Sequence, residues 1–207
     1  MTGFKTARVL ANEAVLNGGV STLVYPDRRW TNPFLSGSGT KQHAINTAFL
    51  NASGHFLDVD ARAGYYSTGW GISPGMVTPS PGKGAFYGIA DVDNQGEALS
   101  GDNNYRLHFP ANVPAKLFWS ITLYDAYTAS LLVGERPFPS LGSNDKPVKN
   151  RDGSTDLYFG PSAPSGKAGN WLPTKPGRNY IAFLRLYGPT EAALDRSWKP
   201  SDFERVK

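Results

Sequence analysis

The feature that most constrains the fold is a change of sequence period between residues 72 and 84. Before it, apolar residues recur at helical spacing, as in 3–17 and 41–53. After it, apolar and polar residues alternate, as in 105–109. A period of two is typical of strands that bury one face, whereas helical spacing indicates amphipathic helices. The chain is therefore expected to combine an N-terminal helical part with a C-terminal sheet.

Several short strands separated by turns are expected after this change. Glycine, proline and asparagine separate the apolar runs and provide the turns. The candidate strands are, in chain order, 86–92, 105–109, 117–125, 131–133, 155–159 and 180–187, with a short closing helix at 191–195. The pattern predicts a mainly β fold, namely an antiparallel β-sandwich of jelly-roll type with N-terminal helices. We expect a helical segment over 1–72, with a further helix at 57–68, packed on a sheet domain over 73–207.

Composition excludes several classes of protein. Aromatic residues make up 13% of the chain and charged residues 18%, which argues against disorder. Cysteine is absent, so disulfides, thiolate nucleophiles and cysteine-based metal sites are excluded. No apolar run is long enough for a transmembrane helix. The net charge of +4 comes from scattered residues rather than a dense stripe, so nucleic acid is not an expected partner.

The N-terminus carries basic residues but no clean apolar run after them, which argues against a signal peptide. The localisation is otherwise unknown. We expect a cytoplasmic protein, unless a targeting segment lies outside this chain.

Six sequence blocks stand out from the rest of the chain. They are 105–110 (YRLHFP), 118–125 (FWSITLYD), 150–154 (NRDGS), 170–173 (NWLP), 184–189 (LRLYGP) and 198–200 (WKP). Their order resembles the DUF1214 family, the C-terminal half of proteins that usually carry a DUF1254 half before it. The resemblance covers roughly 60–207 and implies a jelly-roll-like β-sandwich with attached helices. It implies no activity, because the family is named for unknown function. No DUF1254 half precedes the blocks, so we expect a short family member or a truncated one.

Arg106 and His108 are the first candidate catalytic residues. On a strand over 105–109 they share the face opposite Tyr105, Leu107 and Phe109. If the apolar face meets the core, this pair faces solvent, a groove or a partner. There it could bind an anion or perform acid–base chemistry. The alternative is that both residues simply face solvent.

Asp125 and Arg185 are the other catalytic candidates. Arg185 lies in an otherwise apolar strand, where an arginine commonly pairs with a carboxylate, and Asp125 is the expected partner. The alternative partner is an acidic ligand. Tyr124 and Asp125 end a strand, where they either close a turn by hydrogen bonding or contribute to a ligand site.

Asn170 and Trp171 are candidate ligand-binding residues together with Tyr124. They lie in a loop before Pro173, where an aromatic ring and an amide can line a ligand cleft. The same residues could instead cover one end of the core. Trp119, within a strong candidate strand, is expected in the core, and Trp171 is expected to be the more exposed of the two.

Three aspartates, Asp91, Asp93 and Asp102, are spaced like part of a calcium-binding loop. The fifth position is Gln95, the twelfth is not glutamate, and strands rather than helices flank the loop. A hairpin turn with solubilising carboxylates is therefore the favoured interpretation. A Ca²⁺ or Mg²⁺ site is the alternative, and no other cofactor is expected.

Two functions from different classes follow. The first is a ligand-binding or assembly module that binds a small molecule or forms a homo-oligomer. Apolar residues of the N-terminal helices would mediate this assembly, namely Phe4, Leu10, Phe49 and Phe56. The second is a hydrolase acting on a phosphorylated or glycosidic substrate, with or without a divalent metal. A polar cleft lined by His108, Arg185 and Asp125 would favour the enzyme.

Overall fold

The computed structural model describes residues 23–32, 80–128, 130–134, 136 and 138–206. The helices expected over 3–17, 41–53 and 57–68 lie outside these residues, as do the four apolar residues assigned to assembly. No helix in the described part of the chain is long and apolar enough to cross a membrane.

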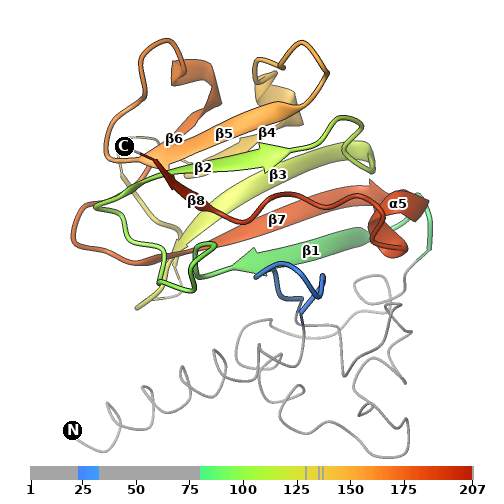
Figure 1. Cartoon of the computed structure of the whole chain (residues 1–207), viewed down its shortest axis with the longest axis horizontal. Helices are drawn as coiled ribbons and strands as arrows, with labels where there is room; N and C mark the ends of the chain where they lie inside the picture. Colours follow the sequence, from blue (N-terminus) through green and yellow to red (C-terminus); the bar gives the residue numbers. More distant parts are fainter. Residues whose placement is uncertain (1–22, 33–79, 129, 135, 137, 207) are drawn as a thin grey trace, which may run out of the picture.

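The described part is mainly β (Figure 1). Its one α-helix, α5 (Glu191–Leu194), confirms the predicted closing helix. Two short 3-10 helices accompany it, η2 (Ser143–Asp145) and η3 (Ala168–Asn170). The described strands are β1 (Ala85–Ala90), β2 (Asn104–Phe109), β3 (Ala115–Asp125), β4 (Ser140–Gly142), β5 (Thr155–Gly160), β6 (Trp171–Pro173), β7 (Tyr180–Pro189) and β8 (Glu204–Val206).

The strands form two four-stranded sheets. One has the order β1-β7-β3-β4 and the other β6-β5-β2-β8. All pairs are antiparallel except β5 and β6, which are parallel. The second sheet is thus mixed, which corrects the expectation of purely antiparallel pairing. The jelly-roll type of β-sandwich stays a prediction.

One predicted strand is wrong. Residues 131–133 form a loop in which Leu131 makes a single bridge to Tyr124. Leu131 and Val133 are 38% and 63% exposed, so this apolar run buries too little surface to be held as a strand. The edge strand β4 forms after it instead.

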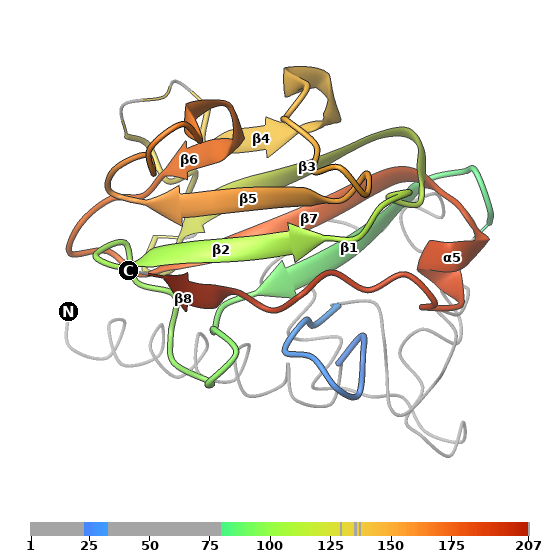
Figure 2. The same cartoon turned by 45° about the horizontal axis from the view of Figure 1, so that its top comes forward.

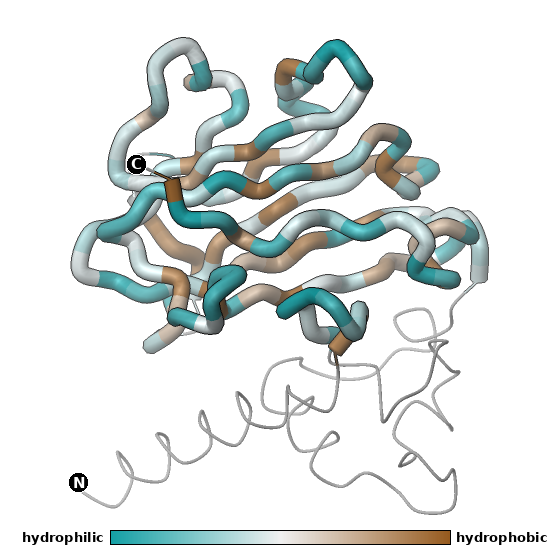
Figure 3. The backbone as a smooth tube through the Cα atoms, viewed as in Figure 1, coloured by the Kyte–Doolittle hydropathy of each residue, from teal (hydrophilic) through white to brown (hydrophobic). Residues whose placement is uncertain are grey.

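The two sheets pack their apolar faces against one core (Figure 2). Along β2 and β7 every second residue is buried. The backbone coloured by hydropathy in Figure 3 shows hydrophobic stretches along the strands of both sheets. Phe109 from β2 meets Trp119 from β3 with ring centroids 5.1 Å apart. Phe203 packs on Phe159 at 4.8 Å, which brings the chain before β8 into the same core. The period-two prediction of a buried face over 105–109 is therefore confirmed.

The segment 23–32 lies beside β1 and contributes to this core (Figures 1 and 2). Thr31 pairs with Ile89 of β1 through two backbone hydrogen bonds of 2.8 Å. On its other side, the buried Trp30 donates its Nε1–H to the Ser201 carbonyl at 2.8 Å. This stretch therefore forms a turn that is hydrogen-bonded on one side to the edge strand β1 and on the other to the chain before β8.

Trp119 is buried and Trp171 is half-buried, which confirms the predicted order of exposure. Simple alternation along 117–125 would place Leu117 on the buried face with Trp119, yet Leu117 is 69% exposed. The register between β3 and β7 shifts between Ala115 and Phe118. An irregularity of this kind changes which face a side chain occupies, so simple alternation fails at the start of β3.

Candidate functional site

A groove of about 640 Å³ opens where β2 leads into β3 and where the chain after β4 returns to β5. Loops from both sheets therefore form its walls. Its lining comprises Ala111, Asn112, Val113, Ala115, Leu117, Phe118, Trp119, Ser143, Lys146, Pro147, Lys149, Asp152, Gly153 and Thr155.

Two lining residues have an unusual backbone conformation. Among the described residues three non-glycine residues have positive φ, and two of them, Asn112 (φ 59°) and Lys146 (φ 53°), line the groove. Asparagine tolerates this left-handed region, but lysine adopts it at a cost of about 1–2 kcal/mol. Lys146 follows η2, and its backbone N–H donates to the Ser143 carbonyl at 3.2 Å. Strain of this kind gathers at functional sites.

The groove combines positive charge with an apolar wall. Lys146 and Lys149 are exposed and share the lining with one carboxylate, that of Asp152. Hydrogen bonds from the Ser154 hydroxyl and backbone N–H lower the pKa of Asp152, so it stays ionised. Leu117 presents an exposed apolar surface in the same lining. Such a groove can hold a small molecule that carries an apolar part and an anionic group.

A chain of hydrogen bonds leads from the groove to His108. Asp152 Oδ1 accepts from the Ser154 hydroxyl at 2.6 Å. Asn150 Nδ2 donates to Ser154 Oγ and to Asp156 Oδ2, both at 3.0 Å. Asp156 Oδ1 lies 2.8 Å from His108 Nδ1. A carboxylate at Nδ1 orients an imidazole and leaves its Nε2 for proton transfer.

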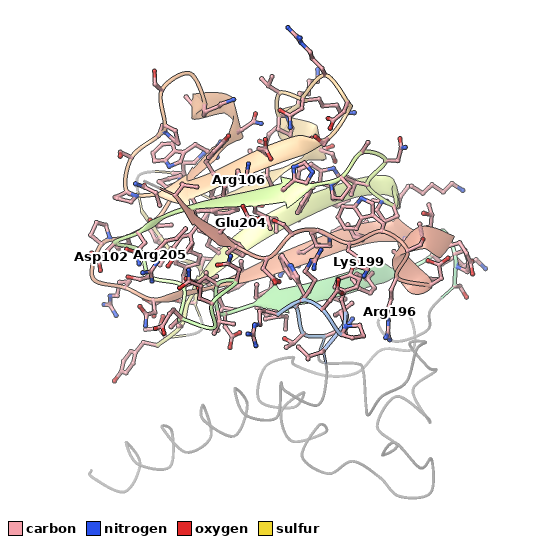
Figure 4. All side chains as sticks on the ribbon, in the orientation of Figure 1. Asp102, Arg106, Arg196, Lys199, Glu204 and Arg205 are labelled. Carbon is pink, nitrogen blue, oxygen red and sulfur yellow. The ribbon has the colours of Figure 1, made fainter. Side chains whose placement is uncertain are left out.

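His108 and Arg106 lie on the outer side of β2, as predicted. Arg106 Nη2 donates to Glu204 Oε2 at 2.6 Å, and Figure 4 shows the two side chains together. We call the outer surface formed by Arg106, His108, Asp156 and Glu204 the polar face. The register explains it, since β2 sets His108 opposite Asp156 of β5 and Arg106 opposite Glu204 of β8.

The charges of the polar face are mutually compensated. The hydrogen bond to Glu204 raises the pKa of Arg106. Partial burial alone would raise the pKa of Asp156, but hydrogen bonds from His108 and Asn150 outweigh it, and the pKa is lowered. Arg106 and Asp156 therefore each have a partner that favours the charged form.

The predicted pair of Arg185 and Asp125 is wrong. Asp125 Oδ1 accepts from the backbone N–H groups of Tyr127 (2.9 Å) and Thr128 (2.8 Å), which confirms its predicted role in closing a turn. Its other oxygen lies 3.6 Å from Arg178 Nη1. Asp125 is on the buried side of its sheet, whereas Arg185 is on the outer side. The four catalytic candidates therefore do not line one cleft.

Asn170 and Trp171 use their polar groups inside the protein. The buried Asn170 side chain donates to the carbonyls of Val148 and Asp156, both at 2.8 Å, and accepts from the Val148 N–H at 2.7 Å. Trp171 donates its Nε1–H to the Gly160 carbonyl at 3.1 Å. These bonds connect the loop before β5, β5 itself and β6. They favour the covering role over the ligand cleft, and the ligand-binding role stays a prediction.

Two of the three aspartates that are spaced like a calcium-binding loop, Asp93 and Asp102, accept hydrogen bonds from backbone N–H groups. Asp93 Oδ1 accepts from the backbone N–H groups of Gln95 and Glu97, both at 3.0 Å. Asp102 Oδ1 accepts from the Gly177 N–H at 3.0 Å. Asp91 is partly buried, and this burial raises the pKa of its carboxyl group. The part of the chain that the structure describes holds no cluster of three potential metal ligands. These contacts favour the hairpin interpretation.

Sequence reasoning missed Lys146, Lys149 and Asp156. The two lysines lie in an irregular loop, where no periodicity indicates which residues meet. Asp156 was recognised as part of a strand, but its contact with His108 depends on the register between β2 and β5. One feature of the sequence did point to this region, namely the NRDGS block over 150–154. Its Asp152 and Gly153 line the groove, and its Asn150 and Ser154 belong to the chain of hydrogen bonds.

Comparison with known proteins gives a family but no activity. The model of a family described as "Protein of unknown function (DUF1214)" matches residues 84–191. None of the curated proteins matches the sequence significantly.

Two solved structures are similar to the chain. The VPA0106 protein from Vibrio parahaemolyticus has 23% sequence identity and a TM-score of 0.58. The match covers 82% of this chain and 40% of that protein, so this chain spans less than half of its length. A putative uncharacterized protein from Burkholderia cenocepacia has 17% identity and a TM-score of 0.37, with 65% and 34% covered. The Vibrio structure supports the fold alone.

Proposed function

The chain belongs to the DUF1214 family, and from this premise we propose that it is a ligand-binding module that takes a small molecule in the groove between the β2–β3 connection and the chain before β5. The observation that carries the proposal is the groove of about 640 Å³ itself. Its volume falls within the range of about 300–1,000 Å³ that is usual for small-molecule sites.

The placement of the catalytic candidates supports a module over an enzyme. His108 belongs to the polar face, Arg185 to the outer side of the other sheet, and Asp125 to a buried turn. A polar cleft uniting these three residues would have favoured the enzyme. Binding needs no such convergence, because a concave surface with a few placed polar groups is sufficient.

The proposal is tested by recording amide NMR spectra of the full chain during titration. The probes are small carboxylates, organic phosphates, monosaccharides and neutral aromatic compounds. We expect at least one class to shift the signals of Asn112, Ser143 and Gly153 in a saturable way. Failure of every class to shift these signals would contradict the proposal.

Two variants make the test specific. Ala115→Trp fills the groove and should abolish the shifts, whereas Ala168→Trp places the same side chain on η3, outside the groove. Lys146→Gly removes a groove ammonium while relieving a positive φ, so it should weaken binding of anionic probes without loss of stability. Equal binding by wild type and Ala115→Trp would place the ligand elsewhere.

A hydrolase is the second candidate, and the contact of 2.8 Å between His108 and Asp156 is the observation that favours it. In this role His108 would act as a general base toward water on a phosphorylated or glycosidic substrate. The assay uses p-nitrophenyl phosphate and p-nitrophenyl glucoside, with and without Mg²⁺. Turnover that His108→Asn abolishes would establish the enzyme, and turnover that persists in His108→Asn would reject this residue.

Homo-oligomerisation is the assembly part of the proposal. Large apolar side chains are strongly exposed after β3 and near β4, as at Phe138 (73%), Val148 (71%) and Val133 (63%). Clusters of exposed apolar residues mark interaction surfaces. Light scattering is expected to give at least a dimer at high concentration, and a monomer there would reject this part.

A further inference from the structure

The outer side of the sheet β1-β7-β3-β4 is aromatic, with one arginine on its central strand β7. Phe183, Arg185 and Tyr187 follow one another along this side of β7. Phe118 and Tyr124 project from the same side of the neighbouring β3. We call the surface formed by these five residues the aromatic face.

The guanidinium of Arg185 is held by aromatic groups. Its Nη2 donates to the Tyr124 hydroxyl at 2.8 Å. Its central carbon lies 5.6 Å from the centroid of the Tyr124 ring and 5.4 Å from that of the Phe183 ring. Both distances suit cation–π attraction, which favours a fixed position for the charge. The arginine is therefore oriented in advance of any ligand.

Most hydrogen-bonding capacity of this guanidinium is unused. The bond to Tyr124 takes one N–H donor, and no other donor of Arg185 has a partner among the described residues. None of these donors is a buried atom without a partner, so they reach the surface. The ion pairs of the described residues also leave Arg185 without a carboxylate.

A second aromatic pair lies further along the same side of the sheet. Tyr187, two residues further along β7, stacks on Phe118 with ring centroids 4.1 Å apart and an interplanar angle of 20°. Along this side of β7 the residue Arg185 thus lies between Phe183 and the Tyr187–Phe118 stack, with its guanidinium against the Phe183 and Tyr124 rings. A ligand that reaches the free donors also contacts aromatic surface.

We propose that the aromatic face is a second binding site, at which Arg185 binds the carboxylate of an aromatic acid. The planar fork of the guanidinium matches a carboxylate through two parallel hydrogen bonds. The Phe183 ring and the Tyr187–Phe118 stack give the aromatic body of the ligand an apolar surface for stacking. No step of this argument depends on the groove, so either site can exist without the other.

The experiment is a titration of the full chain with benzoate and 2-naphthoate, followed through the side-chain Nε–H signal of Arg185. We expect saturable shifts with a Kd on the order of 1 mM for benzoate and tighter binding of 2-naphthoate. Benzyl alcohol and benzylamine, which lack the carboxylate, should leave the signal unchanged. Equal shifts by benzyl alcohol would overturn the proposal, because the carboxylate would then be irrelevant.

Matched variants separate this site from the rest of the surface. Arg185→Met keeps most of the side-chain volume and should weaken 2-naphthoate binding by about tenfold or more. Arg106→Met removes an arginine of the polar face and should leave the affinity unchanged. Equal losses in the two variants would indicate nonspecific attraction by net charge and would overturn the proposal.

A protein partner is the other outcome of the test. If neither acid gives a saturable shift of the Arg185 signal in wild type, the aromatic-acid site does not exist. Self-association that Arg185→Met abolishes in the absence of such shifts would assign the aromatic face to a second copy of the chain instead.

Discussion

The polar face and the aromatic face each present an arginine from the middle of a strand, yet the two arginines have opposite surroundings. Arg106 is bonded to the carboxylate of Glu204 at 2.6 Å, with Asp156 nearby. Arg185 is bonded to a phenol and lies against two rings. The sequence around the two residues is similar, because each is a polar residue flanked by buried apolar ones. The difference shows that the neighbouring strand determines whether an arginine on a sheet pairs with a carboxylate or with a neutral group.

This difference has a consequence for binding. The charge of an arginine paired with a carboxylate is compensated, whereas an arginine held by neutral groups keeps an uncompensated charge for an external anion. The polar face is therefore expected to contribute to stability, and the aromatic face to recognition. The variants below test this division, from the largest expected effect to the smallest.

The largest effect should come from the core that supports both faces. Trp119→Ala removes a buried indole that packs on Phe109 and should cost roughly 3–5 kcal/mol of unfolding free energy. Trp171→Ala removes a half-buried indole with one hydrogen bond to Gly160 and should cost less. Denaturant melts of the two variants give the values. An equal or larger loss at Trp171 would show that this tryptophan, which begins β6 rather than lying in the predicted loop, is a core residue.

The second effect concerns pH and the polar face. The folded-state pKa of Asp156 is lowered, so its stabilising contribution is present above its unfolded value of about 3.9 and is lost as the pH falls through the folded pKa. Asp156→Asn should cost roughly 1–2 kcal/mol at neutral pH. Below about pH 4 the free energy of unfolding of this variant should also fall less steeply with pH than that of wild type.

Stability measured across the acid range checks this prediction. Tyr124→Phe, on the aromatic face, is the control and should keep the acid dependence of wild type. If Asp156→Asn loses stability in acid as steeply as wild type, the His108–Asp156 contact is not a source of acid sensitivity.

The third effect is a difference between the two arginines in how the stability cost of replacing them depends on salt concentration. Arg106→Met breaks a half-exposed ion pair and should cost about 0.5–1 kcal/mol, with the cost shrinking as salt is added. For Arg185→Met we expect a cost independent of salt, since no carboxylate partner is lost among the described residues. Melts at low and high ionic strength compare the two. A strong salt dependence at Arg185 would reveal an ion pair that contradicts the division of roles.

The smallest effect should come from Tyr124→Phe, which removes the hydroxyl that accepts from Arg185. The bond is near the surface, so its loss should cost about 0.5 kcal/mol or less. The affinity for 2-naphthoate should fall only slightly, because the ring that attracts the guanidinium remains. A loss as large as that of Arg185→Met would make the hydroxyl, rather than the guanidinium, the principal ligand-binding group.

Local pattern was sufficient for most of the strands. The alternation over 105–109 predicted both the strand and its buried face, because successive side chains point to opposite sides whatever the rest of the fold does. Over 180–187 the apolar run predicted the strand but not which of its faces is buried. Local pattern failed at 131–133, where an apolar run lacks a partner to bury it. It failed again at Leu117, where a shift in pairing register moves the side chain outward.

The candidate site was predicted less well, because its residues meet through contacts distant in sequence. The polar character of Arg106 and His108 was evident from the sequence, but their partners Glu204 and Asp156 lie 98 and 48 positions away. The groove lysines were missed because the loop after β4 has no period that predicts its path.

The sequence by itself determined which side chains face the core where apolar and polar residues alternate, as over 105–109, because this depends on only a few consecutive residues. Only the tertiary structure decided that Arg106 meets a carboxylate and Arg185 a phenol 61 positions away. That choice depends on the order of strands in each sheet, which sets β8 beside β2 and β3 beside β7. Strand order is fixed by the joint burial of both sheets in one core, and no short stretch of sequence contains that information.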